Sequence, residues 1–307
     1  MSPLLIAIFT GTVIAATPLL LAALGELVVE KSGVLNLGIE GMMLIGAAAG
    51  FLVAVQGGGL LAAFAVAALA GALAAGLFAV LTLIFLTNQY AAGLALAIFG
   101  SGVSATLGAG FGSRPIEALS PLALGPLAEL PVAGPLLFRF DAMVYLALAL
   151  VPATWWWLNR TRAGLVLRVV GEAPGNAHAL GYDVLRIRFL AVLWGGALAG
   201  LAGGYLSLAY TGIWVENMTA GRGWIALSLV VFATWRPVRV LAGAVLFGGV
   251  TILQLHGQIL GLPVPSEALS AAPYLATILV LVLISQNRTR MALDVPLSLG
   301  QPFRARD

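Results

Sequence analysis

Long apolar blocks, separated by short polar or glycine-rich breaks, make up most of this chain. From residue 41 to residue 113 no Lys, Arg, Asp or Glu occurs, which leaves room for about three membrane crossings of the usual length. We therefore predict an all-α protein of the polytopic helical membrane class, with a single transmembrane domain over 1–307. The alternation of apolar blocks with charges, prolines and glycine clusters predicts nine helical spans: 4–25, 41–56, 60–86, 92–110, 141–158, 189–210, 223–235, 238–256 and 272–287.

Two of the predicted spans, 41–56 and 223–235, are too short for an untilted crossing of a bilayer. The first follows a charged segment rich in glycine, and the second lies between a Gly-Arg-Gly triplet and Arg236-Pro237. Helices that break inside a membrane are tolerated where their freed backbone groups face protein or water, as they do along a transport pathway. We expect broken helices here, or ordinary short helices that tilt or lie where the bilayer is thinner.

The composition rules out a soluble enzyme, because 61% of the residues are hydrophobic and only 9% are charged, with a mean hydropathy of +1.05. The 38 glycines suit membrane helices, which approach one another closely where their facing residues are small. Gly196, Gly200 and Gly204 recur at four-residue intervals and predict such a packing face, within the subunit or against a partner. The chain has no cysteine, and hence no disulfide or thiolate metal site.

The net charge of +3 and the pI near 9.6 reflect orientation in a membrane rather than a nucleic-acid partner, because the basic residues occur in ones and twos between apolar blocks. If the N-terminus lies outside, the nine spans place every Lys and Arg inside except Arg114, Arg139 and Arg222. This asymmetry obeys the positive-inside rule. We predict that the N-terminus is outside and the C-terminus inside, with a cytoplasmic tail at about 288–307.

The longest inside segment, at about 159–188, reads NRTRAGLVLRVVGEAPGNAHALGYDVLRIR and contains a short predicted helix. Pro174 has the fixed φ of a first helical turn, and Gly181 can end the helix in a left-handed cap. A short amphipathic helix between two spans can sit in a groove of a soluble partner and transmit that partner's motion. The alternative is an ordinary polar loop with a capped turn.

Four stretches of the chain resemble a known family in their order and spacing. They are GELVVEKSGVLNLGIEGMMLIGA at 25–47, TNQYAAGLALAIFG at 87–100, VVGEAPGNAHALGYDV at 169–184 and GRGWIALSLVVFATWRPVRVLAGAVLFGG at 221–249. Together they resemble the permease subunits of bacterial ABC importers, in the nucleoside and simple-sugar branch that is related to the ribose and branched-chain amino acid permeases.

The resemblance implies a multi-pass protein of the bacterial inner membrane that forms half of a translocation pathway and is not itself an enzyme. Its implied partners are a second, non-identical permease subunit, a cytoplasmic ABC ATPase, an extracellular substrate-binding protein or lipoprotein, and the lipid bilayer. The chain has no G-x-x-x-x-G-K-[ST] loop, so we expect ATP and Mg to be bound by the partner ATPase and no cofactor or metal in this chain. Nucleosides are the cargo that this branch suggests, with a simple sugar as the alternative.

In this family the cytoplasmic loop after the middle of the chain docks on the ATPase. Generic ABC permeases carry a Glu-Ala-Ala…Gly pattern here, whereas this chain has a proline after Glu-Ala and its second alanine further along. The match is therefore to the branch rather than to the generic pattern. The resemblance assigns the coupling role to six residues of the predicted loop: Glu172, Ala173, Pro174, Asn176, Ala177 and Gly181.

Asn36 and Glu40 are candidates for the substrate pathway. They lie beside Gly33, Gly38 and Gly41, which fit a chain that leaves helical geometry near the membrane. Polar groups at such a break are costly unless they are paired or face water, which favours a pathway role. Alternatively, both residues cap helices on the cytoplasmic side.

Asn88, Gln89 and Tyr90 offer amide donors and acceptors with one aromatic face, which is the chemistry that a ribose hydroxyl or a purine edge requires. The predicted topology places them near the inner side, where they fit an exit path for the substrate. Alternatively, they cap the inner end of a helix.

A second group of aromatic and polar residues lies on the predicted outer side, in a short segment before the span at 223–235. Trp214 and Asn217 are its candidates for stacking on a base and reading its edge. The alternative is an interfacial aromatic belt with a surface ion pair. The remaining members of the group are Tyr210, Glu216, Arg222 and Trp224.

Two other classes of function remain open at this point. A proton- or sodium-coupled transporter that works alone needs buried acidic residues, for which only Glu26 and Glu40 are near candidates. A membrane-embedded enzyme needs a cluster of nucleophile, base or metal ligands within the spans, and the sequence shows none. Co-purification separates these classes, because only the ABC interpretation requires an ATPase partner.

Overall fold

The computed structural model describes residues 3–111, 114–122, 125–130, 133–259 and 295–304, with single positions at 271, 275, 278 and 282. In these residues all regular structure is helical and no strand occurs, which confirms the all-α prediction. Among them, six helices are long and apolar enough to cross a membrane: α1 (Pro3–Lys31), α3 (Leu60–Ala79) with the π-helical turn η1 (Val80–Ile84), α4 (Gln89–Gly108), α6 (Ala142–Arg160), α9 (Val184–Tyr205) with the π-helical turn η3 (Leu206–Tyr210), and α11 (Pro237–Ile259).

The remaining described helices are short. Two of them are apolar, namely α2 (Ile39–Val55) and α10 (Arg222–Phe232). Each predicted span from 4–25 to 238–256 coincides with one of the long or short apolar helices. The predicted span at 272–287 lies almost entirely outside the described residues, so the count of nine stays a prediction. The other short helices lie in the connections between the apolar helices. They are η2 (Gly125–Glu129), α5 (Ala133–Leu137), α7 (Arg162–Glu172) and α8 (Pro174–Ala179).

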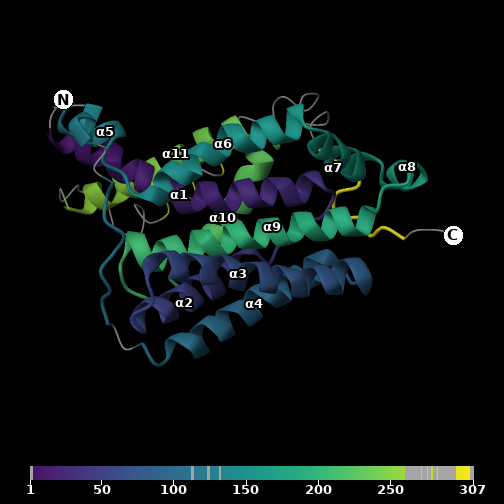
Figure 1. Ribbon diagram of the computed structural model, residues 1–307, viewed down its shortest axis with the longest axis horizontal. Helices are drawn as coiled ribbons and strands as arrows, with labels where there is room; N and C mark the ends of the chain where they lie inside the picture. Colours follow the sequence, from purple (N-terminus) through teal and green to yellow (C-terminus); the bar gives the residue numbers. More distant parts are fainter. Residues whose placement is uncertain are drawn as a thin grey trace.

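α1 and α9 run side by side through the middle of the molecule (Figure 1). They are antiparallel, because Gly25 of α1 lies against Gly195 and Leu198 of α9, whereas Ser32 lies beside Arg188. α2, α3 and α4 lie on one side of this pair, and α6 and α11 lie on the other. α7 and α8 share one end of the molecule with the C-terminal segment, opposite the N-terminus.

The relative directions of the helices agree with the predicted alternation of spans. α1 and α11 are antiparallel, because Gly11 lies against Ile252 whereas Ala16, further along α1, lies against the earlier Gly248. Both of these neighbours of α1, α9 and α11, therefore run in the direction that the predicted alternation gives them. Which end faces the cytoplasm stays a prediction, since it rests on the charges alone.

Glycines let α9 approach its neighbours with backbone contact. Gly196, Gly200 and Gly204 all face α3, where a Cβ added at Gly200 would lie only 2.2 Å from the Ala67 carbonyl oxygen. In lipid, helices associate through such close packing, because the hydrophobic effect between them is weak. The predicted glycine face therefore packs within the subunit.

Candidate functional site

The segment between α1 and α2, residues 32–38, folds back along α1. The Asn36 backbone N–H donates to Glu26 Oε1 at 3.2 Å, and Asn36 Oδ1 accepts from the backbone N–H of Gly38 at 3.0 Å. Glu26 lies more than one turn before the end of α1, and both side chains are buried. α2 therefore begins inside the helix bundle, beside α1, and not at the end of the bundle.

Glu40, in the first turn of α2, binds the beginning of α10. Its carboxylate accepts from the Thr219 hydroxyl at 2.5 Å and from the backbone N–H groups of Gly221 at 2.9 Å and Gly223 at 2.6 Å. The first N–H groups of a helix have no partner within the helix and carry a partial positive charge, so a buried carboxylate is stabilised there. Glu40 thus caps α10, a helix that lies far along the chain. The cytoplasmic side that the alternative interpretation gave to this cap stays a prediction.

α10 covers only part of the height of a membrane. Its 11 residues extend about 17 Å, against roughly 30 Å of hydrocarbon in a bilayer. The helix begins beside Glu40, and just after its end the Trp235 indole N–H donates to Glu30 Oε2 in the last turn of α1. The chain between η3 and α10 therefore enters the bundle before the helix begins. This geometry favours the broken-helix interpretation of the predicted span at 223–235.

Part of the predicted outer group gathers at the beginning of α10. The Arg222 guanidinium lies 6.0 Å from the centroid of the Tyr210 ring and donates to the Met218 carbonyl oxygen at 3.1 Å. Asn217 is exposed and has the left-handed φ of 55°. These side chains form a partly exposed polar and aromatic surface beside the helix end that Glu40 caps.

Trp214 lies apart from this surface and packs against α4. A Cβ added at Gly108 would lie 2.1 Å from its ring, and Phe111 meets the ring edge-on at a centroid distance of 5.5 Å. Its indole Nε1 is buried without a hydrogen-bond partner among the described residues. The structure thus places Trp214 and Asn217, which are neighbours in the sequence, in different surroundings.

Asn88, Gln89 and Tyr90 also lie in three different surroundings, at the beginning of α4. Asn88 caps this helix by accepting from the backbone N–H of Ala91 at 3.1 Å. Gln89 is buried, and its Oε1 accepts from the backbone N–H of Leu35 at 2.8 Å, so it supports the folded-back segment. Tyr90 is 52% exposed. A pathway role for the three residues stays a prediction.

The folded-back segment therefore gathers three of the predicted pathway residues: Asn36 within it, Glu40 just after it and Gln89 from α4. All three are buried, and their hydrogen bonds are made within the subunit. In this arrangement they position α2, α4 and α10 relative to one another. Among the other candidates, Asn88, Tyr90 and Asn217 are exposed, and a role for them in binding substrate stays a prediction.

The predicted coupling helix is present as α8. Pro174 is its first residue, and Gly181 has a φ of +87° just after its end, as the sequence predicts. The backbone N–H of Gly181 donates to the His178 carbonyl oxygen at 2.8 Å, and that of Tyr182 donates to the Ala177 carbonyl oxygen at 3.1 Å. This pair of bonds is the Schellman motif, in which glycine is favoured at the left-handed position.

α8 has one face in the protein and one face open. Ala177 is completely buried and packs with Val170 and Val184, whereas Asn176 is exposed and Leu180 is 72% exposed. Ala173 joins α8 to α7, and Glu172 at the end of α7 accepts from the backbone N–H of Leu297 through Oε2 at 3.3 Å. A short helix that is held by its buried side and exposes Leu180 and Asn176 is a suitable docking element for a soluble partner.

Two features of this region were not predicted. α7 precedes α8 as a full amphipathic helix, and its signal is Thr161 as N-cap before a mostly apolar stretch that contains Arg162 and Arg168. Arg188, which we assigned only to orientation, is completely buried and donates to the Ser32 carbonyl oxygen at 3.0 Å and to Ser298 Oγ at 2.8 Å. The sequence gives no signal for this second feature, because the partners lie at the far ends of the chain.

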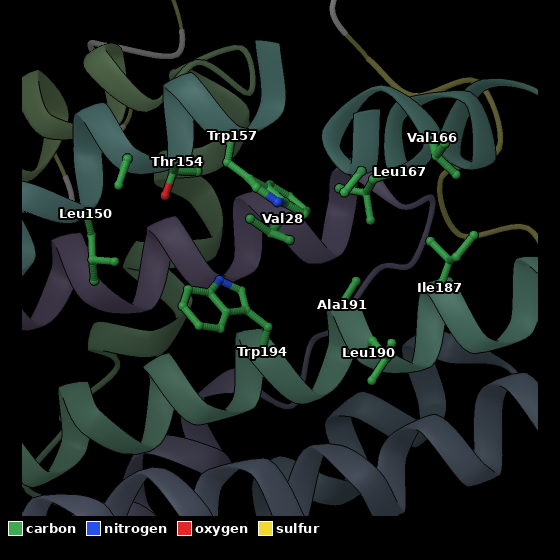
Figure 2. Close-up of a pocket in the computed structure, with 12 residues that line it drawn as sticks. Val28, Leu150, Thr154, Trp157, Val166, Leu167, Ile187, Leu190, Ala191 and Trp194 are labelled. Atoms are coloured by element: carbon green, nitrogen blue, oxygen red, sulfur yellow. The ribbon is translucent and has the colours of Figure 1, made fainter. Parts of the chain in front are cut away.

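A cavity of about 620 Å³ lies between α1, α6, α7 and α9 (Figure 2). Trp157 and Trp194 extend toward it from α6 and α9, and Val28 of α1 lies between these two helices. Its lining is apolar apart from Thr154, and none of the predicted site residues contributes to it. A nucleoside or a sugar needs hydrogen-bonding partners, so this cavity does not have the chemistry of the pathway.

Comparison with known proteins gives the family. The profile of the branched-chain amino acid transport system permease component matches residues 8–284. A relative from Haloferax volcanii, named "Putative glucose ABC transporter permease protein", is 41% identical over 96% of this chain and 97% of its own. No solved structure matches the chain.

Two bacterial relatives carry names that refer to nucleosides. The guanosine ABC transporter permease protein of Bacillus subtilis is 33% identical over 89% of this chain and 90% of its own. The nucleoside ABC transporter permease protein of Lactococcus lactis is 32% identical over 90% of this chain and 91% of its own. Because the family profile covers most of the chain and six helices are long and apolar enough to span a bilayer, this chain belongs to the branched-chain amino acid permease family and is a multi-pass inner-membrane permease subunit of an ABC transporter, not an enzyme.

Proposed function

We propose that this permease subunit forms half of the translocation pathway of an ATP-driven importer for nucleosides. In this proposal it pairs with a second, non-identical permease, with a cytoplasmic ATPase that binds ATP and Mg, and with an extracellular binding protein that delivers the substrate. The two relatives named for guanosine and nucleosides support the cargo assignment. Membership of an ABC permease family is incompatible with a carrier that works alone on an ion gradient.

The observation that carries the proposal is the partly exposed surface at the beginning of α10. It combines the aromatic face of Tyr210 with the guanidinium of Arg222 and the amide of Asn217. A flat base stacks on an aromatic or guanidinium plane, while base edges and ribose hydroxyls need donors and acceptors. A surface with both kinds of group suits a nucleoside better than a sugar, which has no planar base.

In this proposal, α8 and the residues around it couple transport to ATP hydrolysis by the partner ATPase. The exposed Leu180 and Asn176 are available to a groove of the ATPase, and the buried Ala177 fixes the helix to α7 and α9. ATP binding would close the ATPase subunits, displace α8, and open the permease pair toward its other side. Alternating access of this kind requires that the substrate bind weakly in the permease, since tight binding would slow release.

A simple sugar is the second candidate cargo, because the Haloferax volcanii relative carries a name that refers to glucose and is 41% identical. Sugars and nucleosides share hydroxyl groups, so the amides and Arg222 serve either. Only a nucleoside carries a planar base, so the decisive property is whether the aromatic face is used for stacking.

Uptake in cells that carry the complete transporter tests the cargo. Radiolabelled guanosine, adenosine, uridine, ribose and glucose are supplied separately, and cells without this permease give the background. We expect permease-dependent uptake of at least one nucleoside. Uptake of ribose or glucose without any nucleoside would reject the cargo assignment and leave the permease assignment intact.

A further inference from the structure

Two buried glutamates from different helices bind the two ends of α10. At its beginning, Glu40 of α2 accepts from the backbone N–H groups of Gly221 and Gly223. Just after its end, the Trp235 indole donates to Glu30 of α1, which is completely buried. A buried polar group inside a membrane bundle is costly unless it is paired. Glu40 accepts through both of its oxygens, and Glu30 accepts through Oε2.

Left-handed residues other than glycine flank α10 on both sides. Asn217 and Ala220 precede it with φ values of 55° and 46°, and Thr234 and Trp235 follow it with φ values of 49° and 53°. Such residues are uncommon, and they persist where the surrounding structure imposes them, notably in switch regions. α10 is therefore a short regular helix between two irregular turns, which is the arrangement of a rigid element between hinges.

The contact at the end of α10 adjoins the coupling region. Gly171, in the last turn of α7, lies so close to the end of α1 that an added Cβ would be 2.2 Å from the Lys31 carbonyl oxygen. On the other side of the same turn, the Lys31 ammonium lies 6.0 Å from the Trp235 ring centroid. The last turn of α1 thus contacts both α7, which leads into α8, and Trp235, which follows the end of α10.

We propose that α10 transmits the displacement of α8 to the interior of the membrane. The displacement passes from α7 to the last turn of α1, from Glu30 to Trp235, and along α10 to Arg222 and Glu40. Trp235 and Glu40 are then positioning residues for transport, which act through α10 and do not bind substrate. The inference rests on the proposed coupling role of α8, but it does not depend on which cargo is transported.

The variant Trp235→Phe tests the contact at the end of α10, because it keeps an aromatic ring and removes the N–H that Glu30 accepts. We expect the maximal rate of uptake to fall about tenfold, which is the effect expected from the loss of one buried hydrogen bond, while the KM stays unchanged. ATP hydrolysis by the assembled complex should continue. Trp194→Phe is the matched control, since Trp194 is 44% exposed and lines the apolar cavity.

The variant Glu40→Gln tests the contact at the beginning of α10. It also keeps the inference testable if Trp235→Phe fails to fold. The amide keeps one oxygen acceptor but cannot accept from both helix N–H groups and the Thr219 hydroxyl as the carboxylate does. We expect the same loss of maximal uptake without a change in KM. Glu117→Gln, at an exposed position in the connection between α4 and α6, is the control and should leave uptake unchanged.

Site-specific labelling measures the movement of α10 directly. The chain has no cysteine, so Glu216→Cys, beside the hinge residue Asn217, gives this subunit a single site for a maleimide. In the complete transporter we expect its labelling rate to differ several-fold between the resting and the nucleotide-trapped complex. Adding Trp235→Phe or Glu40→Gln should abolish that difference.

A labelling difference that survives both variants, together with normal uptake, would overturn the inference. Gly181→Val, which disrupts the end of α8, separates this result from a failure of the proposed function. If Gly181→Val abolishes the labelling difference and the two α10 variants do not, α8 couples by another route. If Gly181→Val changes neither labelling nor uptake, the coupling role of α8 fails, and the inference fails with it.

Discussion

At the scale of single residues, the buried polar groups of this permease serve to position its helices. Asn36, Glu40 and Gln89 have the chemistry of substrate ligands, and the same chemistry lets them bind backbone groups. Glu40 and its partner Gly221 are 181 positions apart, so no local pattern in the sequence distinguishes the two roles. The sequence predicted a break in helical geometry beside Asn36 and Glu40 and a path or capping role for Gln89, and the structure supplied the partners of all three.

Arg188 gives a prediction at this scale. It is completely buried, and its guanidinium donates to the Ser32 and Gln301 carbonyl oxygens and to Ser298 Oγ. Arg188→Ala should lower the free energy of unfolding by about 3 kcal/mol, because buried acceptors lose a charged donor. The apparent Tm of the purified complex measures this loss.

Arg186→Ala is the control for Arg188, since Arg186 is exposed one half-turn earlier in the same helix. Its effect should stay within about 0.5 kcal/mol. Equal Tm values for the two variants would contradict a role for Arg188 in joining the end of α1 to the C-terminal segment.

At the scale of elements, hydrophobic runs located the apolar helices well, because each crossing needs a continuous apolar stretch. Their ends were predicted less well: α1 continues to Lys31, six residues beyond the predicted 4–25, since Glu26 and Glu30 are paired inside the bundle. α7 was missed because its short apolar run contains Arg162 and Arg168 and lies in a segment that is otherwise rich in polar residues. The capped α8 was predicted because proline and glycine have strict local requirements.

The crossing of α9 and α2 gives a prediction on packing. A Cβ at Gly203 would lie 1.8 Å from the Met43 carbonyl oxygen, and backbone cannot move aside as a side chain can. Gly203→Ala should therefore cost about 1–3 kcal/mol and reduce the amount of folded permease in the membrane. Gly102→Ala on α4 is the control, because nothing lies within 4 Å of its added Cβ. Normal levels of both variants would show that the two helices separate more easily than the structure indicates.

The end of α8 gives a prediction on coupling. Valine is strongly disfavoured at the φ of +87° that Gly181 adopts, whereas asparagine tolerates the left-handed region. Gly181→Val should lower uptake and the stimulation of ATP hydrolysis by the loaded binding protein, with normal membrane insertion. Gly181→Asn should retain both activities. Wild-type activity of the valine variant would mean that the cap geometry of α8 is not needed for coupling.

At the scale of the whole molecule, the orientation in the membrane follows from charge. All Lys and Arg residues except Arg114, Arg139 and Arg222 lie on one side in the predicted topology. A reporter fused after Asp307 should be active only in its cytoplasmic form, and one inserted between Ser120 and Leu130 only in its external form. The reverse pattern of activity would overturn the orientation and would place α8 on the side without ATP.

In the proposed function, transport is performed by the whole assembly of permeases, ATPase and binding protein, and not by this chain alone. Charge, composition and family resemblance predicted the class of protein, because they depend on the entire sequence. The site residues were harder to predict, because side chains such as those of Arg222 and Tyr210 come together only in the folded chain. The proposal that this subunit imports nucleosides with energy from a partner ATPase is therefore tested on the reconstituted complex.

Nucleoside accumulation in proteoliposomes tests this proposal directly. The proteoliposomes contain both permeases and the ATPase, and the binding protein is added on the side of the membrane opposite to the ATPase. Radiolabelled guanosine, adenosine and uridine are compared in the presence of ATP and of a non-hydrolysable analogue. We predict that at least one nucleoside accumulates only with ATP and the binding protein. Nucleoside flux that is equal with and without hydrolysable ATP, or accumulation of sugars alone, would contradict the account.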